Sequence, residues 1–173
     1  MLACVIPKRS VQTSPDGFAG HAKFSHTQAW KVVKALQPIT VLYVEDHDLV
    51  LFTVKQMLEL EGWRVRICRD GNQARKQLAS DEHYDLIILD VELPGASGFE
   101  LIRQARALPT RQAVPIVMFT ASDCTDEVLA LGANECLTKP GGIKDLLAVC
   151  YRLLKLEPAH EADKRTNRAI NGG

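Results

Sequence analysis

The stretch LIILDVELPGASG, residues 86–98, decides the fold. It begins with four aliphatic residues, continues with an aspartate, and ends in a segment that contains Pro94, Gly95 and Gly98. A continuous apolar run predicts a strand covered on both faces, as in parallel sheets packed between helices, and the Pro and Gly residues predict turns after it. The sequence therefore predicts an internal parallel strand with an acidic residue, Asp90, at its carboxyl end.

Around this stretch, strand-like segments alternate with segments of helical periodicity. The other strand-like segments are ITVLYVE (39–45), WRVRICR (63–69), VPIVMFT (114–120) and ECLTK (135–139). After the first of them, apolar Val50, Val54, Met57 and Leu58 fall on one helical face, and Gly62 predicts the end of that helix. Five strand-then-helix repeats with short connections predict a doubly wound α/β domain.

The two ends of the chain differ in texture from the alternating region, which spans residues 39–156. Residues 1–38 mix Pro, Gly, Ser and His, with helical spacing only around Trp30. We expect an N-terminal extension there with one short amphipathic helix. Residues 157–173 are polar and lack periodicity, which predicts a flexible tail.

The composition excludes several classes of protein. The chain is 46% hydrophobic and 24% charged, typical of a globular domain, and 21 basic residues balance 21 acidic ones. This balance disfavours binding to nucleic acid or anionic lipid. No apolar run approaches the roughly 20 residues of a membrane helix. The five cysteines never form a C-x-x-C pair, so we expect no zinc site or disulfide framework, and a cytoplasmic location.

Polar residues end four of the five predicted strands. Glu45 and Asp46 follow the first strand, Asp90 the third, Thr120 the fourth and Lys139 the fifth. Taken singly, each has an ordinary explanation as a turn, cap or loop residue. In an open parallel sheet, however, sites form beyond the carboxyl ends of the strands. The coincidence at four strand ends therefore favours one shared site.

The residue types at these strand ends suit phosphoryl transfer. Crowded carboxylates repel one another, and Mg²⁺, which prefers oxygen ligands, relieves that repulsion. A carboxylate can also act as a nucleophile toward phosphorus. The transfer itself depends on positioning and charge neutralisation. Lys139 and the metal would neutralise the charge on two faces of the phosphoryl group. The hydroxyl of Thr120 would donate a hydrogen bond to a third phosphoryl oxygen.

With these residues in place, the sequence resembles the receiver domain family of response regulators. The matching pieces are VLYVEDH, LIILDVELPGASG, VMFTAS and GANECLTKP. The separations of 44 positions from Asp46 to Asp90 and of 30 from Asp90 to Thr120 also resemble those of the family. The resemblance covers about residues 39–156. It implies a flavodoxin-like sheet of five parallel strands, in the order 2-1-3-4-5, with flanking helices.

The resemblance also implies a role for each candidate residue. Asp90 would be the phosphoacceptor, and Asp46 a direct ligand of Mg²⁺. Glu45 would reach the metal through water, and Glu92 would offer its backbone carbonyl. The phosphoryl group would be contacted by Thr120 and Lys139, and the Lys139–Pro140 bond is expected to be cis, as in the family.

By the same resemblance, the chain is a signalling receiver rather than an enzyme. It would take a phosphoryl group from a partner histidine kinase or histidine phosphotransfer protein. It would then signal by binding another protein, and we expect no nucleic-acid or membrane partner. Too few residues follow Leu156 for an output domain, which predicts a stand-alone receiver or a receiver cut from a larger hybrid protein.

The sequence departs from the family pattern in its output half. Cys136 stands where the family often has Tyr or Phe, three positions before Lys139. Only 19 positions separate Thr120 from Lys139, about three fewer than usual, or roughly one helical turn. We therefore expect the fourth helix to be a stub around residues 127–131 and the usual switch to be altered.

Two rival functions remain open from the sequence. A degenerate receiver would keep the fold and bind partners without phosphorylation. A phosphohydrolase of the haloacid-dehalogenase type also uses Mg²⁺ and an aspartate at a strand end. That class typically has a second aspartate two positions later and its nucleophile on an early strand. Here the second position is Glu92, and an acidic pair precedes Asp90 by a whole β-α-β unit.

Overall fold

Five parallel strands form one sheet, in the order β2-β1-β3-β4-β5, in the computed structural model, which describes residues 38–123 and 125–157. The strands are β1 (Thr40–Val44), β2 (Arg64–Cys68), β3 (Leu86–Leu89), β4 (Ile116–Thr120) and β5 (Glu135–Thr138). Each lies inside the segment that the sequence predicted. The doubly wound α/β fold and its strand order are confirmed. The expected N-terminal helix and all of the expected tail after Glu157 lie outside the described residues.

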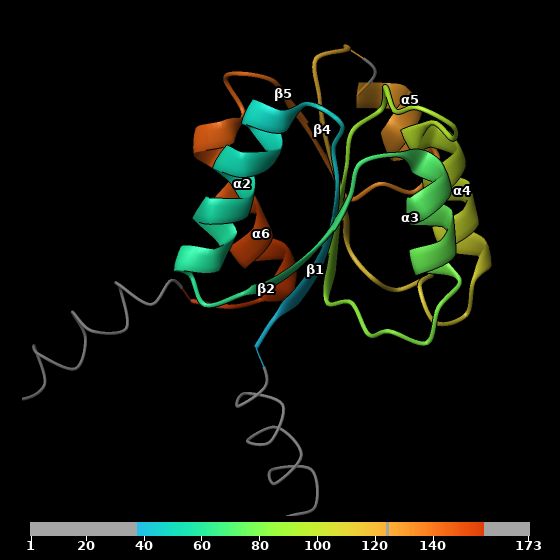
Figure 1. The fold of residues 1–173 in the computed structure, drawn as a ribbon, viewed down its shortest axis with the longest axis horizontal. Coiled ribbons are helices and arrows are strands. Elements are labelled where there is room, and N and C mark those ends of the chain that lie inside the picture. The colour runs from blue at the N-terminus through green and yellow to red at the C-terminus, as the bar shows by residue number, and fades with distance from the viewer. Residues whose placement is uncertain (1–37, 124, 158–173) are drawn as a thin grey trace, which may run out of the picture. The chain divides into compact units, whose positions relative to one another are not determined.

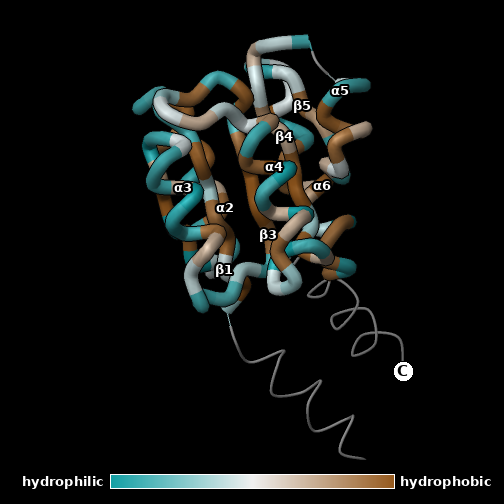
Figure 2. Tube along the Cα trace, turned by 90° about the vertical axis from the view of Figure 1, so that its right-hand side faces the viewer, coloured by the Kyte–Doolittle hydropathy of each residue, from teal (hydrophilic) through white to brown (hydrophobic). Residues whose placement is uncertain are grey.

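Helices cover both faces of the sheet (Figure 1). The helices are α2 (Asp48–Leu60), α3 (Gly71–Leu78), α4 (Gly98–Ala107), α5 (Thr125–Ala130) and α6 (Ile143–Leu154). One face carries α2 and α6, and the other carries α3, α4 and α5. Figure 2 shows hydrophobic residues along the strands and the inward faces of the helices. No helix among the described residues is long and apolar enough to cross a membrane.

The alternation of side chains in β1 serves both faces. Val41 and Tyr43 belong to the core beneath α2 and α6, whereas Leu42 and Val44 belong to the core beneath the other three helices. Every residue of β1, β3 and β4 is buried, while the edge strands β2 and β5 are partly exposed. The continuous apolar runs of the sequence therefore follow from burial on both faces of the sheet.

Helix α2 packs with a slightly different face from the one that periodicity indicated. The structure buries Leu51, Val54 and Leu58, whereas Val50 and Met57 are half-buried at the edge of the same core. The helix contacts β2 and α6, and these contacts decide which apolar residues of its inward face are fully covered. Its end agrees with the sequence, since Gly62 follows it in the left-handed region at φ 76°.

The shortened fourth helix is present as α5, which has six residues. Arg106 of α4 stabilises this region. Its guanidinium donates to the carbonyl of Gly132 at 2.9 Å, to that of Val114 at 2.8 Å and to the side-chain oxygen of Asn134 at 3.0 Å. The loop before β4 and the loop before β5 are thus held from one point, and burial lowers the pKa of Arg106. The expected stub is confirmed, and its bounds begin two residues earlier.

The first turn of α3 packs directly on the loop that follows Asp90. The amide of Gly71 donates to the carbonyl of Pro94 at 2.8 Å. A Cβ at Gly71 would lie 1.8 Å from the carbonyl oxygen of Ala96, far inside contact distance. The loop after Asp90 therefore requires a residue without a side chain at the start of α3.

We expect Gly71→Ala to lower the free energy of unfolding by about 2 kcal/mol or more, because the new methyl group must displace backbone atoms. Helix propensity alone predicts the opposite sign, since Ala is favoured over Gly by about 1 kcal/mol inside helices. Urea unfolding followed by circular dichroism measures the difference. Gly141→Ala is the matched control, because a Cβ there meets nothing within 4 Å. A Gly71→Ala variant as stable as the wild type would contradict this view of the loop.

Candidate functional site

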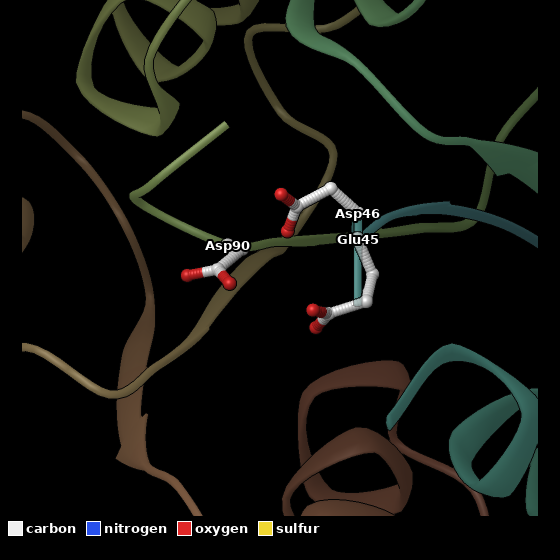
Figure 3. A group of neighbouring side chains, drawn as sticks. All are labelled: Glu45, Asp46 and Asp90. Carbon is white, nitrogen blue, oxygen red and sulfur yellow. The ribbon is translucent and has the colours of Figure 1, made fainter. Parts of the chain in front are cut away.

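Three carboxylates meet at the carboxyl edge of the sheet. One oxygen from each of Glu45, Asp46 and Asp90 lies within 4.8 Å of the other two (Figure 3). Glu45 is fully buried and Asp90 is 7% exposed, while Asp46 is open to solvent. The structure thus brings together the three acidic residues that the sequence placed at the ends of two strands.

The register of the sheet explains why these groups meet. Tyr43 pairs with Ile88 and Val44 with Leu89, so Glu45 lies opposite Asp90. The amide of Asp90 donates to the carbonyl of Val44 at 3.0 Å, which fixes this alignment beyond the last strand residue. Side chains alternate along a strand, so Glu45 continues the row of Tyr43, toward α2 and α6. Asp46 leaves β1 on the opposite side (Figure 3).

Lys139 joins the two buried carboxylates from across the sheet. Its ammonium lies 2.6 Å from Oε2 of Glu45 and 2.6 Å from Oδ2 of Asp90, and the side chain is 12% exposed. The Lys139 amide donates to the carbonyl of Thr120 at 2.8 Å, and the Lys139–Pro140 bond is cis, as expected. In the part of the chain that the structure describes, this is the one cation that pairs with Glu45 and Asp90.

The two oxygens of Asp90 have different surroundings. Oδ2 accepts from Lys139, whereas Oδ1 accepts from the backbone amide of Val91 at 2.6 Å and from that of Glu92 at 3.4 Å. These amides belong to the turn after β3, so the local backbone orients the carboxylate. Asp90 therefore enters the site with a fixed rotamer and with both oxygens hydrogen-bonded.

Thr120 and Glu92 are linked through a serine that the sequence reasoning missed. Thr120 is almost fully buried, and its Oγ1 accepts from the amide of Ser122 at 3.2 Å. The Ser122 hydroxyl donates to Oε1 of Glu92 at 2.6 Å. The loop after Asp90 is thus bonded to the loop after Thr120. The signal in the sequence was a polar side chain two positions after each of two strand ends.

Tyr43 is the second residue that the sequence reasoning missed. It lies in β1 with no exposed surface, and its hydroxyl donates to Oε2 of Glu45 at 3.2 Å. Burial, followed by the negative charge of Glu45, raises the pKa of Tyr43 well above its usual range, so the phenol stays neutral. Oε1 of Glu45 accepts from the amide of His47 at 3.2 Å. A tyrosine in a strand of aliphatic residues, two positions before a glutamate, was the available signal.

Among the described residues, neither His47 nor any cysteine joins the carboxylates of the site. The His47 side chain is exposed at the N-cap of α2 and makes no capping hydrogen bond. Cys136 is half-buried in β5 and packs against the core beneath α3, α4 and α5. Cys68 and Cys150 are buried, and burial raises the pKa of the Cys150 thiol to about 12, so it is inert as a nucleophile. Cys124 lies outside the described residues.

The donor set fits a hard divalent cation. Three carboxylates carry three negative charges, and the paired ammonium of Lys139 offsets one of them. Asp46 is exposed, so it remains accessible to a hydrated ion. Oxygen ligands of this charge are those that Mg²⁺ takes in sites that also hold phosphate oxygens. The geometry therefore supports a metal-assisted reaction of a phosphate compound at Asp90.

The model of one protein family, the response regulator receiver domain, matches residues 41–151. Among curated proteins, the response regulator MprA of Mycolicibacterium vanbaalenii is 35% identical over 121 residues, which are 68% of this chain and 51% of that protein. The regulatory protein VanRB of Enterococcus faecalis is 36% identical over 133 residues, which are 75% of this chain and 59% of that protein. The chain thus spans about half the length of these relatives.

Solved structures show the same fold. The receiver domain of a sensor histidine kinase from Pseudomonas aeruginosa, with a magnesium ion in its active-site cleft, is 30% identical with a TM-score of 0.63. That match covers 69% of this chain and 99% of the other. The chemotaxis response regulator CheY4 of Vibrio cholerae is 30% identical with a TM-score of 0.62, covering 68% of this chain and 99% of the other.

We expect Lys139→Met to destabilise the metal-free protein by about 2–4 kcal/mol, because it leaves the buried carboxylate of Glu45 without its cation. Chemical unfolding in the presence of a chelator measures this loss. Lys55→Met is the matched control. It breaks an exposed ion pair with Glu59 on α2 and should change stability by less than about 0.5 kcal/mol. Equal stabilities of the two variants would show that Lys139 does not compensate the buried charge.

Proposed function

Because this chain belongs to the response regulator receiver domain family, we propose that it accepts a phosphoryl group on Asp90 from a phosphohistidine, with Mg²⁺. The donor would be a histidine kinase or a histidine phosphotransfer protein. One observation carries the proposal: Glu45, Asp46 and Asp90 converge around one point, with Lys139 bridging two of them. Receiver domains are signalling modules, and this chain works in the cytoplasm as one rather than as a turnover enzyme.

Each strand-end residue has a task in the proposed transfer. A carboxylate oxygen of Asp90 attacks phosphorus, a P–O bond forms, and the P–N bond of the phosphohistidine breaks. The electron pair of that bond returns to the imidazole nitrogen of the donor. Asp46, the carbonyl of Glu92 and, through water, Glu45 would hold the Mg²⁺, which neutralises charge on the phosphoryl oxygens. The remaining phosphoryl oxygens would be bonded by Thr120 and Lys139.

The burial of Asp90 supports a product that persists. Its side chain is 10% exposed. An acyl phosphate is lost by attack of water, so restricted access at this position lengthens its lifetime. The hydrogen bond from Val91 to Asp90 also keeps the carboxylate in one orientation before the donor arrives.

Exposed apolar residues beside the site support a protein as the phosphoryl donor. Helix α2 begins two residues after Asp46, and its first two turns present Leu49, 69% exposed, and Phe52, 57% exposed. A donor histidine has to reach Asp90, so the donor protein must cover the surface next to it. Large apolar side chains there favour docking of a protein surface over binding of a free small phosphate.

The output of the receiver would differ from the usual one. A ligand or modification acts through a free-energy difference between two conformations. Cys136 lacks the aromatic ring that changes rotamer in the family, and α5 has six residues. We infer that phosphorylation instead biases the 91–98 loop, because the bond from Ser122 to Glu92 couples this loop to that after Thr120.

The downstream target is proposed from the receiver domain alone, because the match covers about half the length of the relatives. The relatives named above are a response regulator and a regulatory protein, and another relative from Bacillus subtilis is named as a transcriptional regulatory protein, 39% identical over 111 residues. Their additional length lies outside the match. For this chain we therefore propose phosphoryl reception and binding of a further protein.

Incubation with acetyl phosphate and Mg²⁺, followed by intact-protein mass spectrometry, tests phosphoryl reception. We expect one added phosphoryl group per chain, absent in Asp90→Asn and in the presence of a chelator. Asp81→Asn is the matched control for loss of one carboxylate, because Asp81 is exposed in the loop before β3. Asp85 is unsuitable, because its carboxylate accepts a hydrogen bond from the amide of Thr40. A folded protein that binds Mg²⁺ but never gains the group would instead be a receiver that binds partners without phosphorylation.

The lifetime of the phosphorylated form tests the role of Glu92. Gln keeps an oxygen that can accept from Ser122 but removes the negative charge beside the phosphoryl group. We expect Glu92→Gln to slow the loss of phosphate about twofold to fivefold, because a like charge nearby destabilises the acyl phosphate, with Asp81→Asn as the matched control. Time courses by mass spectrometry after removal of acetyl phosphate give the rates. Identical rates for wild type and Glu92→Gln would exclude this role.

A further inference from the structure

The carboxylate of Glu45 has three hydrogen-bond donors, and they differ in what they can do. Oε2 accepts from the hydroxyl of Tyr43 at 3.2 Å and from the ammonium of Lys139 at 2.6 Å, and Oε1 accepts from the amide of His47 at 3.2 Å. The amide is fixed by the backbone and the phenol by the core. Lys139 alone has a long flexible side chain and a second acidic partner, Asp90.

The proposed transfer draws Lys139 away from Glu45. Lys139 has three N–H donors, and a phosphoryl group on Asp90 would present three charged oxygens to them. As the ammonium turns to that group, Oε2 of Glu45 loses its charged partner. Glu45 has no exposed surface, so bulk solvent does not replace the lost bond on Oε2, and a buried carboxylate oxygen without a donor is strongly unfavourable. The phenol of Tyr43 is the donor that remains on Oε2.

The fold holds Tyr43 where it can act in this way. Tyr43 and Glu45 are two positions apart in extended backbone, so their side chains lie on the same side of the sheet. The ring belongs to the core beneath α2 and α6, and Tyr43 pairs with Ile88 in the register of the sheet. The hydroxyl is therefore held by packing on both sides and does not depend on the position of Lys139.

We propose that Tyr43 is a positioning residue, whose hydroxyl holds Oε2 of Glu45 in place while Lys139 moves from Glu45 to the phosphoryl group. The inference rests on the proposed function of Asp90. An uncharged donor suits this task because it stabilises the carboxylate without reducing the negative charge that attracts Mg²⁺. Without the hydroxyl, Lys139 is the one side-chain donor to Oε2 among the described residues, so its release leaves that oxygen without a side-chain donor.

A purely structural role makes a different prediction. If the hydroxyl only satisfies a buried oxygen, its removal lowers the melting temperature and leaves Mg²⁺ binding and phosphorylation unchanged. If Tyr43 positions Glu45, then the dissociation constant for Mg²⁺ and the rate of phosphorylation change as well. Tyr43→Phe separates the two, since Phe keeps the packed ring and removes one oxygen atom.

Tyr84→Phe is the matched control. Tyr84 is also fully buried, and its hydroxyl lies 2.7 Å from Oε1 of Gln77 and 3.1 Å from Oε2 of Glu82, in the core on the opposite face of the sheet. The substitution Tyr84→Phe therefore removes a buried hydroxyl that lies away from the site. Circular dichroism establishes that both variants are folded and gives their melting temperatures.

Isothermal titration with MgCl₂ and labelling by acetyl phosphate at saturating Mg²⁺ complete the experiment. We expect Tyr43→Phe to weaken Mg²⁺ binding about threefold to tenfold and to slow labelling by a similar factor, a range that corresponds to the net contribution of one ordinary hydrogen bond. Tyr84→Phe should stay within about twofold of wild type in both. Wild-type affinity and rate in Tyr43→Phe would overturn the inference and leave phosphoryl reception intact.

A double-mutant cycle with Glu45→Gln tests whether Tyr43 acts through Glu45. On that background, Tyr43→Phe should change the Mg²⁺ dissociation constant by less than about twofold, because the carboxylate it serves is absent. An undiminished effect there would overturn the inference. If wild-type protein neither binds Mg²⁺ nor gains a phosphoryl group, then the proposed function fails, and the inference about Tyr43 fails with it.

Discussion

The burial of two carboxylates at one edge of the sheet is the constraint on which the rest of the site depends. Glu45 and Asp90 lie opposite each other because β1 and β3 pair in one register, and like charges so close in a dry site repel strongly. Lys139 relieves that repulsion in the absence of a metal. In the proposed transfer the same ammonium would also bind the phosphoryl group, so the charge balance of the site would be tied to its chemistry.

This constraint explains the polar groups that surround the carboxylates. Backbone amides hold one oxygen of Asp90 and one of Glu45, and Tyr43 supports the other oxygen of Glu45. Within the described residues, no buried side-chain nitrogen or oxygen lacks a hydrogen-bond partner. A buried site can hold this much charge only if every oxygen is satisfied. Preorganisation of the carboxylates and stability of the fold therefore depend on the same hydrogen bonds.

The output half of the domain, which contains α5 and Cys136, is stabilised by other contacts than the carboxylate site. With six residues in α5, the loop before β4 and the loop before β5 are joined by the guanidinium of Arg106. Cys136 fills only part of the volume of an aromatic ring. The bond from Ser122 to Glu92 directly connects the loop after Asp90 with the loop after Thr120. In the proposed function, a change at Asp90 would be transmitted through this bond without rotation of an aromatic side chain.

The sequence by itself determined the fold and the main residues of the site. Apolar runs with both faces covered predict parallel strands, and polar residues at strand ends are visible without coordinates, so Asp90, Thr120 and Lys139 could be found. Even the short fourth helix followed from the spacing between two of them. These features are local in the chain or repeat at fixed distances, which is why the sequence contains them.

The tertiary structure alone decided which atoms touch. The Glu92–Ser122 bond joins residues 30 positions apart, and the Lys139–Glu45 pair joins residues 94 apart. Neither spacing nor periodicity encodes such contacts, since they depend on strand register and on the directions of side chains at loop ends. Tyr43 shows the difference within one strand. The sequence shows that Tyr43 stands two positions before Glu45, and by itself this describes an ordinary core residue. The direction of the hydroxyl is fixed only by the packing of α2 and α6.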